Sequence, residues 1–313
     1  MVLEHGSFLQ AERCPLSQRR EALLHLAAVN DPSHQADLQR ALERAKAAPN
    51  VVWQGLRVVK RGAHIETALW VEPMEGNTAR LWLPGVQHEC LGTLLSDARQ
   101  WVGAQGYTLC HVALGESDSH WEPALVKSAM ERLAALWHLS VALSTPPAMP
   151  KTVPETMPKT TPETLEVAPF GALGREAQLG LLQGVSDGSL DCPALLEALP
   201  IQTLLSGFYA GAPDAPGHWY RILHEGETAG VLLLAPQSPA RWELQLMGLL
   251  PGWRGRGLGR ALLERAMRLA FQAGARELCL TVDAHNAPAV RLYLDAGFER
   301  ESEQLLYAWR KPS

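Results

Sequence analysis

The chain has 313 residues, a length that favours two domains, each large enough to bury its own core. Hydrophobic residues make up 47% of the sequence and charged residues 19%, a balance that excludes an extensively disordered protein. The 28 Lys and Arg against 33 Asp and Glu give a net charge of −5, which argues against a nucleic-acid partner.

Cysteine usage and the lack of long apolar runs point to a cytoplasmic protein. The five cysteines are far apart and form no Cys-x-x-Cys pair, so we expect reduced thiols, with no disulfide framework and no metal site. Residues 1–14 lack the basic and apolar regions of a signal peptide. No apolar run approaches the ~20 residues needed to cross a bilayer, so no membrane partner is expected.

The N-terminal half is predicted to alternate helices and strands. Residues 7–13 are a candidate first strand, and helices are expected over 16–31 and 32–48. Three meandering strands are expected over 51–85. The remaining predicted elements are a helix ending at Gly106, a strand over 107–114, a helix over 122–137 and a strand over 138–143.

A proline-rich segment separates the two halves. It contains an octapeptide repeat, MPKTVPET at 149–156 and MPKTTPET at 157–164, with almost no apolar residue to bury. Such a sequence favours a semi-rigid polyproline II spacer, and a docking motif for a proline-binding partner is the alternative. We therefore expect domains at 1–144 and 165–313, joined by a linker over 145–164.

The C-terminal half is predicted to begin with helices and to continue as a meander of strands. A helix over 257–274 is indicated by apolar residues spaced by three or four positions. The other predicted elements are a strand over 165–170, helices over 175–187 and 192–211 (the second interrupted at Pro200), a hairpin over 219–237, strands over 241–250 and 277–284, a helix over 288–297 and a closing strand or hairpin over 299–311. The predicted fold class is α/β (α+β), with mixed, mostly antiparallel sheets flanked by helices.

The stretch LLPGWRGRGLGRALL, residues 249–263, places three glycines, Gly255, Gly257 and Gly259, within five positions between an apolar strand-like run and an apolar helix-like run. No Lys-Ser/Thr pair follows, which excludes a Walker A loop, and an antiparallel meander precedes it where a dinucleotide fold needs a parallel sheet. The remaining pattern is Arg254-x-x-Gly257-x-Gly259. Bare backbone N–H groups at a helix N-terminus are suited to a pyrophosphate.

Residues 241–298 resemble the core of the GNAT superfamily, the acyl-CoA-dependent N-acetyltransferases. The [QR]-x-x-G-x-[GA] loop of that family is matched by RGRGLG, and its N-x-x-A-x-x-x-Y-x-x-x-G-F signature by NAPAVRLYLDAGF from Asn286 to Phe298. The similarity extends more loosely over 165–313. The element order of the N-terminal half is similar, but LPGVQHECLGTLL stands where the glycine loop belongs. The architecture thus resembles tandem GNAT enzymes of the mycothiol synthase type, with a degenerate N-terminal repeat lacking the coenzyme A motif.

The resemblance implies acetyl-CoA as cofactor and assigns its contacts. Main-chain groups of the strand that precedes the loop would hold the pantetheine arm, and the backbone that follows would hold the pyrophosphate, with Arg254 and Arg260 adding positive charge. The implied contacts are Met247, Gly248, Leu249, Arg254, Gly255, Arg256, Gly257, Leu258, Gly259 and Arg260. Asn286 would contact the pantetheine or acetyl region, and its alternative role is the N-cap of the next helix.

Direct acetyl transfer needs an acid for the leaving thiolate and a base for the amine. The resemblance assigns Tyr293 as the acid, with a core tyrosine as the alternative. Some relatives carry a Glu base five residues before the Asn, where this chain has Thr281. Glu243, on the same strand face as Leu249, is the predicted base, and Asp283 is the second choice.

Two functions remain open from the sequence. The first is an N-acetyltransferase that moves an acetyl group from acetyl-CoA to a primary amine of a small molecule or peptide. The second is a catalytically weak coenzyme-A-binding regulatory or scaffold protein, which the loss of a Glu at Thr281 would favour. Residues 165–313 alone are expected to bind coenzyme A, and residues 1–144 alone are not.

Overall fold

The computed structural model describes residues 9–28, 32–47, 52–143, 165–211 and 215–311. The chain forms two compact units, of which the first contains residues from both ends of the sequence and the second is one continuous segment. Unit 1 consists of Met1–Leu133 and Leu305–Ser313, and unit 2 consists of Ala134–Gln304. The predicted linker, 145–164, lies outside the described residues. Independent domains at 1–144 and 165–313 therefore remain a prediction.

Unit 1 is a twisted sheet with helices on both faces. Its strands follow the order β1-β2-β3-β4-β5, and only the β4–β5 pair is parallel. The elements are β1 (Ala11–Arg13), α1 (Arg19–Ala27), α2 (Pro32–Ala47), β2 (Leu56–Arg61), β3 (His64–Met74), β4 (Thr78–Trp82), α4 (Leu91–Gln105), β5 (Leu109–Gly115) and α5 (Glu122–Lys127). The last residues of β12 (Glu299–Arg310) also belong to this unit.

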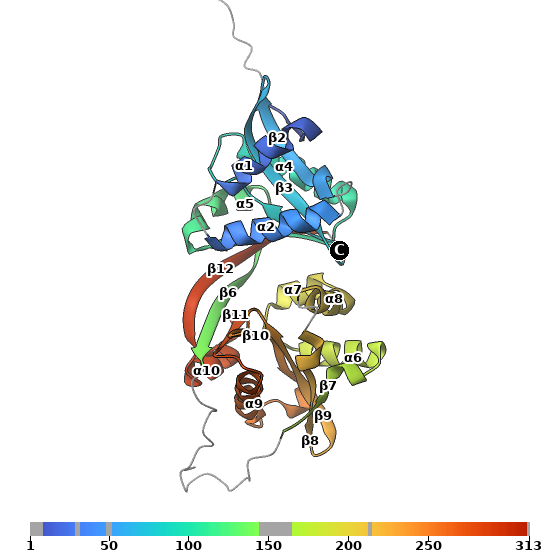
Figure 1. Ribbon diagram of the computed structural model, residues 1–313. Helices are drawn as coiled ribbons and strands as arrows, with labels where there is room; N and C mark the ends of the chain where they lie inside the picture. The colour runs from blue at the N-terminus through green and yellow to red at the C-terminus, as the bar shows by residue number, and fades with distance from the viewer. Residues whose placement is uncertain (1–8, 29–31, 48–51, 144–164, 212–214, 312–313) are drawn as a thin grey trace, which may run out of the picture. The chain divides into compact units, whose positions relative to one another are not determined.

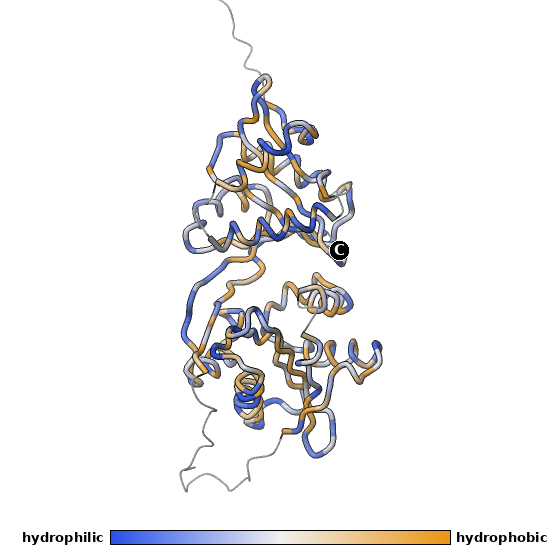
Figure 2. The backbone as a smooth tube through the Cα atoms, viewed as in Figure 1, coloured by the Kyte–Doolittle hydropathy of each residue, from blue (hydrophilic) through white to orange (hydrophobic). Residues whose placement is uncertain are grey.

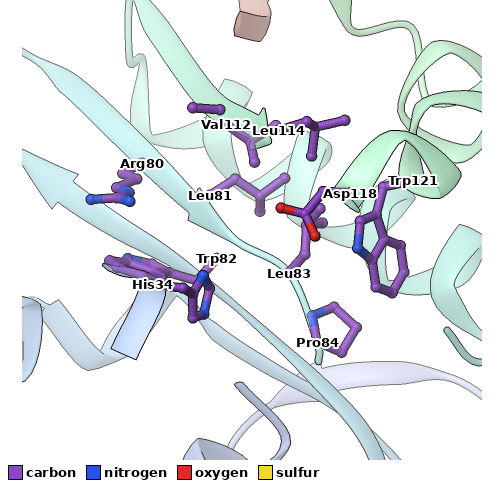
Figure 3. A pocket seen from close by; sticks show the side chains of 11 residues that line it. His34, Arg80, Leu81, Trp82, Leu83, Pro84, Val112, Leu114, Asp118 and Trp121 are labelled. Carbon is purple, nitrogen blue, oxygen red and sulfur yellow. The ribbon is translucent and has the colours of Figure 1, made fainter. Parts of the chain in front are cut away.

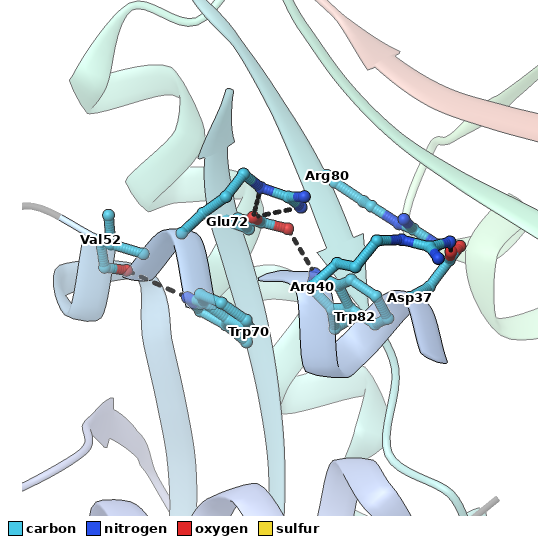
Figure 4. A network of polar contacts seen from close by, with 8 residues as sticks. Asp37, Arg40, Val52, Trp70, Glu72, Arg80 and Trp82 are labelled. Atoms are coloured by element: carbon cyan, nitrogen blue, oxygen red, sulfur yellow. Dashed lines mark hydrogen bonds and ion pairs between the residues drawn. The ribbon is translucent and has the colours of Figure 1, made fainter. Parts of the chain in front are cut away.

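A buried carboxylate ties α2 to the sheet of unit 1. Glu72 on β3 is 1% exposed. Its Oε1 accepts hydrogen bonds from Nε and Nη2 of Arg44, at 3.1 and 2.8 Å, and its Oε2 accepts one from Trp82 Nε1 at 2.9 Å (Figure 4). A buried charge that is fully paired in this way is a structural feature, because removing either partner would leave it uncompensated.

From β7 on, unit 2 repeats the order of elements of unit 1, with one additional helix before its antiparallel strands. The strand order is β12-β6-β11-β10-β9-β8-β7, in which β10 and β11 are parallel. The elements are β6 (Glu131–Ala142, from Ala134 on), β7 (Glu166–Pro169), α6 (Arg175–Ser186), α7 (Pro193–Ala198), α8 (Ile201–Gly211), β8 (Trp219–His224), β9 (Glu227–Pro236), β10 (Arg241–Leu249), α9 (Leu258–Gln272), β11 (Glu277–Asp283) and α10 (Ala287–Asp295). The predicted fold class is confirmed.

Two apolar layers enclose the sheet of unit 2. On one face, α9 and α10 pack on β9, β10 and β11 through residues such as Leu262, Leu280 and Tyr293. On the other face, α6 and α8 pack on β9 through Leu182, Leu205 and Leu233. Apolar residues accordingly run along the central strands, whereas α9 carries them on one side only (Figure 2).

The two halves of the chain exchange strands. Residues 136–142 of β6 pair antiparallel with β11, from Asp283↔Leu136 to Glu277↔Ala142, and Figure 1 shows β6 (green) beside the red and orange strands of the C-terminal half. In return, Tyr307 and Trp309 of β12 lie in the core of unit 1. Trp309 Nε1 donates to Ser128 O at 2.9 Å.

This exchange corrects one element of the sequence prediction. A single helix was expected over 122–137, but α5 ends at Lys127 and β6 begins at Glu131. Ala129 adopts a left-handed backbone at the junction, with φ +62°. The predicted interruption of the helix over 192–211 at Pro200 is confirmed, since α7 ends at Ala198 and α8 begins at Ile201. Within the described residues, every helix is too short or too polar to cross a membrane.

Candidate active site

The candidate site lies where β10 and β11 part. Their parallel pairing runs from Arg241↔Glu277 to Leu244↔Leu280 and goes no further. Beyond that point β10 stays paired with β9 and β11 with β6. A register shift between β10 and β9 at Leu244/Leu246 coincides with the parting. We call the opening between residues 245–249 of β10 and 281–283 of β11 the fork.

Among the described residues, the fork is bordered by apolar side chains, a glycine and one unpartnered acceptor, and its use as a pantetheine site remains a prediction. Met247 and Leu249 pack their side chains against the core under α9 and α10. A Cβ on Gly248 would lie 2.9 Å from Val185, so a glycine is needed here for α6 to pack on β10. Gln245 Oε1 is buried and has no hydrogen-bond partner among the described residues. Such an orphaned acceptor is normally satisfied by a ligand or a water.

The glycine loop continues from the fork into α9 with its backbone exposed. Gly255 and Gly257 have left-handed conformations, φ +73° and +82°, which side chains other than glycine rarely adopt. An ideal Cβ at either position would meet nothing within 4 Å, so this surface is open. Gly257 is the N-cap of α9, and no described side chain caps that end. The N–H groups of the first turn, from buried Leu258 onward, are therefore free to bind an anion.

Arg254 anchors this loop to the rest of unit 2. Its Nε donates to Leu249 O at 2.9 Å, its Nη1 to Asp187 O at 2.7 Å and its Nη2 to Val185 O at 2.9 Å. The guanidinium thereby joins the ends of β10 and α6. Its predicted contact with a phosphate remains a prediction, and the observed contacts give it a positioning role.

Two other arginines supply exposed positive charge on the loop. Arg256 lies over the ring of Trp253, with Cζ 5.0 Å from the ring centroid. Arg260, in the first turn of α9, is exposed and its Nε lies 3.3 Å from Glu264 Oε1. Both side chains therefore lie at the same open end as the bare N–H groups. Gly259 lies beside them and approaches Leu292 of α10, 3.6 Å from an ideal Cβ.

Asn286 begins α10 at the end of the fork. Its Oδ1 accepts from Ala289 N at 3.4 Å, which confirms the N-cap role, and its contact with a cofactor remains a prediction. Asp191, which precedes α7, accepts from Asp283 N at 2.8 Å. Burial raises the pKa of Asp191, and the charge of Asp283 adds to the rise, while hydrogen bonds from Asp283 N and Asn286 oppose it.

Tyr293 lies on the core face of the fork. The side chain is 8% exposed, and its ring centroid is 5.7 Å from that of Phe298. Burial raises the pKa of Tyr293, and the charge of Asp191 adds to the rise. The hydroxyl therefore keeps its proton at neutral pH, as a proton donor must.

The predicted bases lie on the opposite face from Tyr293. The expectation that Glu243 shares a strand face with Leu249 was wrong, because the register shift at Leu244/Leu246 interrupts the alternation of β10 and turns Leu249 toward the core that holds Tyr293. Glu243 is opposite Cys279 in register, before the parting, and its Oε2 accepts from Gln237 Nε2 at 3.2 Å. Asp283 is 3% exposed, and its Oδ1 accepts from the backbone N–H of His285 at 2.9 Å. The sequence did not indicate Asp191 or Gln245, because neither belongs to a recognisable motif.

Unit 1 has a corresponding opening that side chains fill. The parallel pairing of β4 and β5 ends at Arg80↔His111. The opening holds only about 50 Å³, room for one or two waters, and Trp82, Leu114 and Trp121 are among its lining residues (Figure 3). Among the described residues from 83 to 105 none has a positive φ, so this unit has no counterpart of the glycine loop.

Comparisons with known sequences place residues 191–298 in the Acetyltransferase (GNAT) family. The chain is 35% identical over 99 residues to a mycothiol acetyltransferase of Catenulispora acidiphila, a match that covers 32% of this chain and 29% of that protein. It is 33% identical over 117 residues to the aminoalkylphosphonate N-acetyltransferase of Salmonella typhimurium, which covers 36% of this chain and 76% of that enzyme.

Solved structures match the fold over nearly the whole chain. A GCN5-related N-acetyltransferase from Sphaerobacter thermophilus superposes with a TM-score of 0.62 at 18% identity, covering 97% of this chain and 96% of that one. A tandem GNAT protein from the clavulanic acid biosynthesis pathway superposes with a TM-score of 0.50 at 18% identity, covering 82% of this chain and 83% of that one. This chain belongs to the GNAT family of acetyltransferases, as is established by the family match together with the aminoalkylphosphonate N-acetyltransferase, of which the chain covers 76%.

Proposed function

We propose that the protein is an N-acetyltransferase that moves an acetyl group directly from acetyl-CoA to a primary amine of a small molecule or peptide. The observation that carries the proposal is the fork of β10 and β11 with the open glycine loop at its end. The mycothiol and aminoalkylphosphonate acetyltransferases among the relatives favour a small-molecule acceptor.

The residues present fit coenzyme A. The backbone N–H groups from Gly255 to Arg260 would hold its pyrophosphate at the positive end of α9, assisted by Arg256 and Arg260. The fork edge of residues 247–249 would hold the pantetheine arm. Acetyl-CoA supplies the thioester carbonyl that the amine attacks.

The chain's own residues would then orient the reaction and move protons. Tyr293 holds a proton on the core side of the fork, where burial keeps its hydroxyl neutral. Asn286 fixes the start of α10, on which Tyr293 is carried. Glu243 as the base for the amine remains a prediction, since its carboxylate lies before the parting of the strands.

An amine screen tests the proposed activity. The full chain is incubated with acetyl-CoA and a panel of aminoalkylphosphonates, amino sugars, amino acids, polyamines and short peptides, and released thiol is measured. Turnover with at least one amine is expected. Tight coenzyme A binding without turnover on any of them would instead favour the regulatory or scaffold alternative.

A negatively charged side chain at Gly257 should disrupt the pyrophosphate site. Gly257→Asp adds a Cβ at φ +82° and a charge at the N-terminus of α9. We expect coenzyme A to bind at least about tenfold more weakly, a change of ~1.4 kcal/mol measurable by calorimetry.

Gly274→Asp is the matched control for this substitution. Gly274 also has a positive φ, +103°, and open space around its Cα, but it follows the opposite end of α9. Each substitution should lower stability by ~1–2 kcal/mol, because each forces a side chain into a left-handed backbone. Equal coenzyme A affinity in the two variants would remove the loop from the site.

A further inference from the structure

Thr281 lies at the point where the fork opens. It is the first residue of β11 beyond the last pair with β10, Leu244↔Leu280, and it is exposed. On its other edge β11 is paired with β6, and the residue opposite Thr281 is His138. Thr281 Oγ1 lies 3.0 Å from His138 Nδ1, a hydrogen bond between the two strands.

This pair faces away from Tyr293. Residues of β11 alternate between the two faces of the sheet, so Leu280 and Val282 enter the core beneath α9 and α10, where Tyr293 lies. Thr281 therefore faces the other side. A group at the fork would have a phenol on one side and the Thr281–His138 pair on the other.

Among the described residues, a carboxylate and an unpartnered ring nitrogen are found at His138. His138 Nε2 is buried and has no hydrogen-bond partner among the described residues. Glu301 of β12 is the nearby carboxylate: its pKa is lowered mainly by a hydrogen bond from Arg241, then by Ser140, the charge of Arg241 and the charge of His138.

The other ionisable groups on this face belong to β10 and β11. Glu243 and Asp283 carry carboxylates on the Thr281 face, and Arg241 is paired both with Glu301, at 2.7 Å, and with Glu277. Because Arg241 is shared between two carboxylates, the face retains acidic groups that would attract a cationic amine.

We propose that Thr281 and His138 form a proton relay that deprotonates the acceptor amine, with Thr281 touching the amine and His138 acting through it. The inference rests on the proposed acetyltransferase function. It replaces the single Glu expected at this position by two side chains, one of which comes from the N-terminal half through the exchanged strand.

The relay takes one proton from the ammonium form of the amine. That proton passes to Thr281 Oγ1 while the hydroxyl proton of Thr281 passes to His138 Nδ1, which frees the lone pair of the nitrogen. The neutral amine then bonds to the thioester carbonyl carbon, the C–S bond breaks, and the departing sulfur takes the proton of Tyr293. The nitrogen gives up a second proton, Tyr293 regains one, and His138 releases its proton to solvent. In total, two N–H bonds of the ammonium group and a C–S bond are replaced by an amide C–N bond, a thiol S–H bond and one proton in solvent.

Imidazole is suited to this step because histidine is the side chain whose ordinary pKa lies nearest neutrality. The geometry also favours this pair over Glu243. Glu243 is in register with Cys279, two residues before Thr281, and is bonded to Gln237. Thr281 is at the parting of the strands itself.

The test compares Thr281→Val, Thr281→Ser and His138→Gln in the full chain, using the panel amine with the highest wild-type kcat/KM. We expect Thr281→Val and His138→Gln to lower kcat/KM by about 10²-fold or more near neutral pH. The activity of both variants should recover at alkaline pH, because the amine is then already neutral. Thr281→Ser keeps the hydroxyl and should restore most of the activity. Coenzyme A affinity should be unchanged in all three variants.

A second measurement does not depend on turnover. The ring-nitrogen NMR signals of His138 should show an unprotonated Nδ1 in the neutral form, since this atom must accept the Thr281 proton, and Thr281→Val should shift that signal. His64→Gln is the matched control, because His64 is an exposed residue of unit 1. It should change neither kcat/KM nor the NMR signals of His138.

Several outcomes would overturn the relay. The first is an NMR result that places the proton of the neutral His138 ring on Nδ1. The second is a wild-type pH profile of kcat/KM in Thr281→Val and His138→Gln. The third is a loss of activity that occurs in Glu243→Gln and in neither of those two variants. An acetyl group left on Thr281 after acetyl-CoA alone would replace the relay by covalent transfer. If the wild type acetylates no amine, the proposed function fails, while the NMR measurement still decides whether the pair has the required proton arrangement.

Discussion

Replacing Tyr293 with phenylalanine should lower kcat by about 10²–10⁴-fold while coenzyme A binds with nearly wild-type affinity. The substitution keeps the ring that packs against Phe298 and removes only the hydroxyl. The thiolate would then leave without a proton donor. Because no hydrogen bond between described residues joins this hydroxyl to the glycine loop, the cofactor site should be preserved.

The pH dependence of the Tyr293→Phe defect follows from burial. Burial raises the pKa of Tyr293 above the ordinary tyrosine value of about 10. The wild-type hydroxyl therefore stays protonated through neutral and mildly alkaline pH, and the defect should be constant between about pH 6 and 9. Single-turnover kinetics with calorimetry of coenzyme A binding would separate chemistry from binding.

Tyr307 offers a matched control for the same substitution. It is buried even more deeply, at 1% exposure, and its hydroxyl donates to Glu122 in unit 1. Tyr307→Phe should lower stability by about 1 kcal/mol through the lost hydrogen bond but leave kcat unchanged. A Tyr293→Phe enzyme with wild-type kcat would show that water protonates the thiolate, and Tyr293 would then be a wall of the site.

Features encoded in a contiguous stretch of sequence were predictable. Gly257 is the N-cap of α9 and has a left-handed conformation. Asn286, which is followed by Pro288, is the N-cap of α10. Both depend on the local backbone, which residue type largely determines. The glycine loop, the start of α9 and the start of α10 could therefore be located without a structure.

Contacts between distant residues were not predictable. Residues 131–137 read ERLAALW, which favours a helix by propensity, yet the segment forms the first part of β6, which lies between β12 and β11 in the sheet and pairs with β11 from Leu136 on. The partner of His138 lies 143 residues further along the chain. Arg254 was likewise assigned to a phosphate from its motif position, whereas its carbonyl partners at Val185 and Asp187 lie 69 and 67 residues away.

The exchanged strand leads to the last prediction, on truncation. The sequence suggests that residues 165–313 would bind coenzyme A alone, but the strand register argues against it. Without β6, the whole edge of β11 from Glu277 to Asp283 loses its partner. The core beneath α9 and α10 also loses Leu139 and Leu143, which are 0% and 2% exposed. Each lost leucine costs about 2–5 kcal/mol, so the total is comparable with the whole stability of a domain.

We therefore expect residues 165–313 to be unfolded or aggregated and to bind no coenzyme A, whereas residues 131–313, which add β6, should fold better and bind it. Circular dichroism, size-exclusion chromatography and calorimetry on the two fragments would measure the difference. Leu139→Asp in residues 131–313 is the control for mere chain length, because it keeps the segment but places a charge at a fully buried position. It should behave like the shorter fragment. A folded 165–313 with wild-type coenzyme A affinity would show that β6 is dispensable for the cofactor site, and the N-terminal half would then contribute to the fork only through His138.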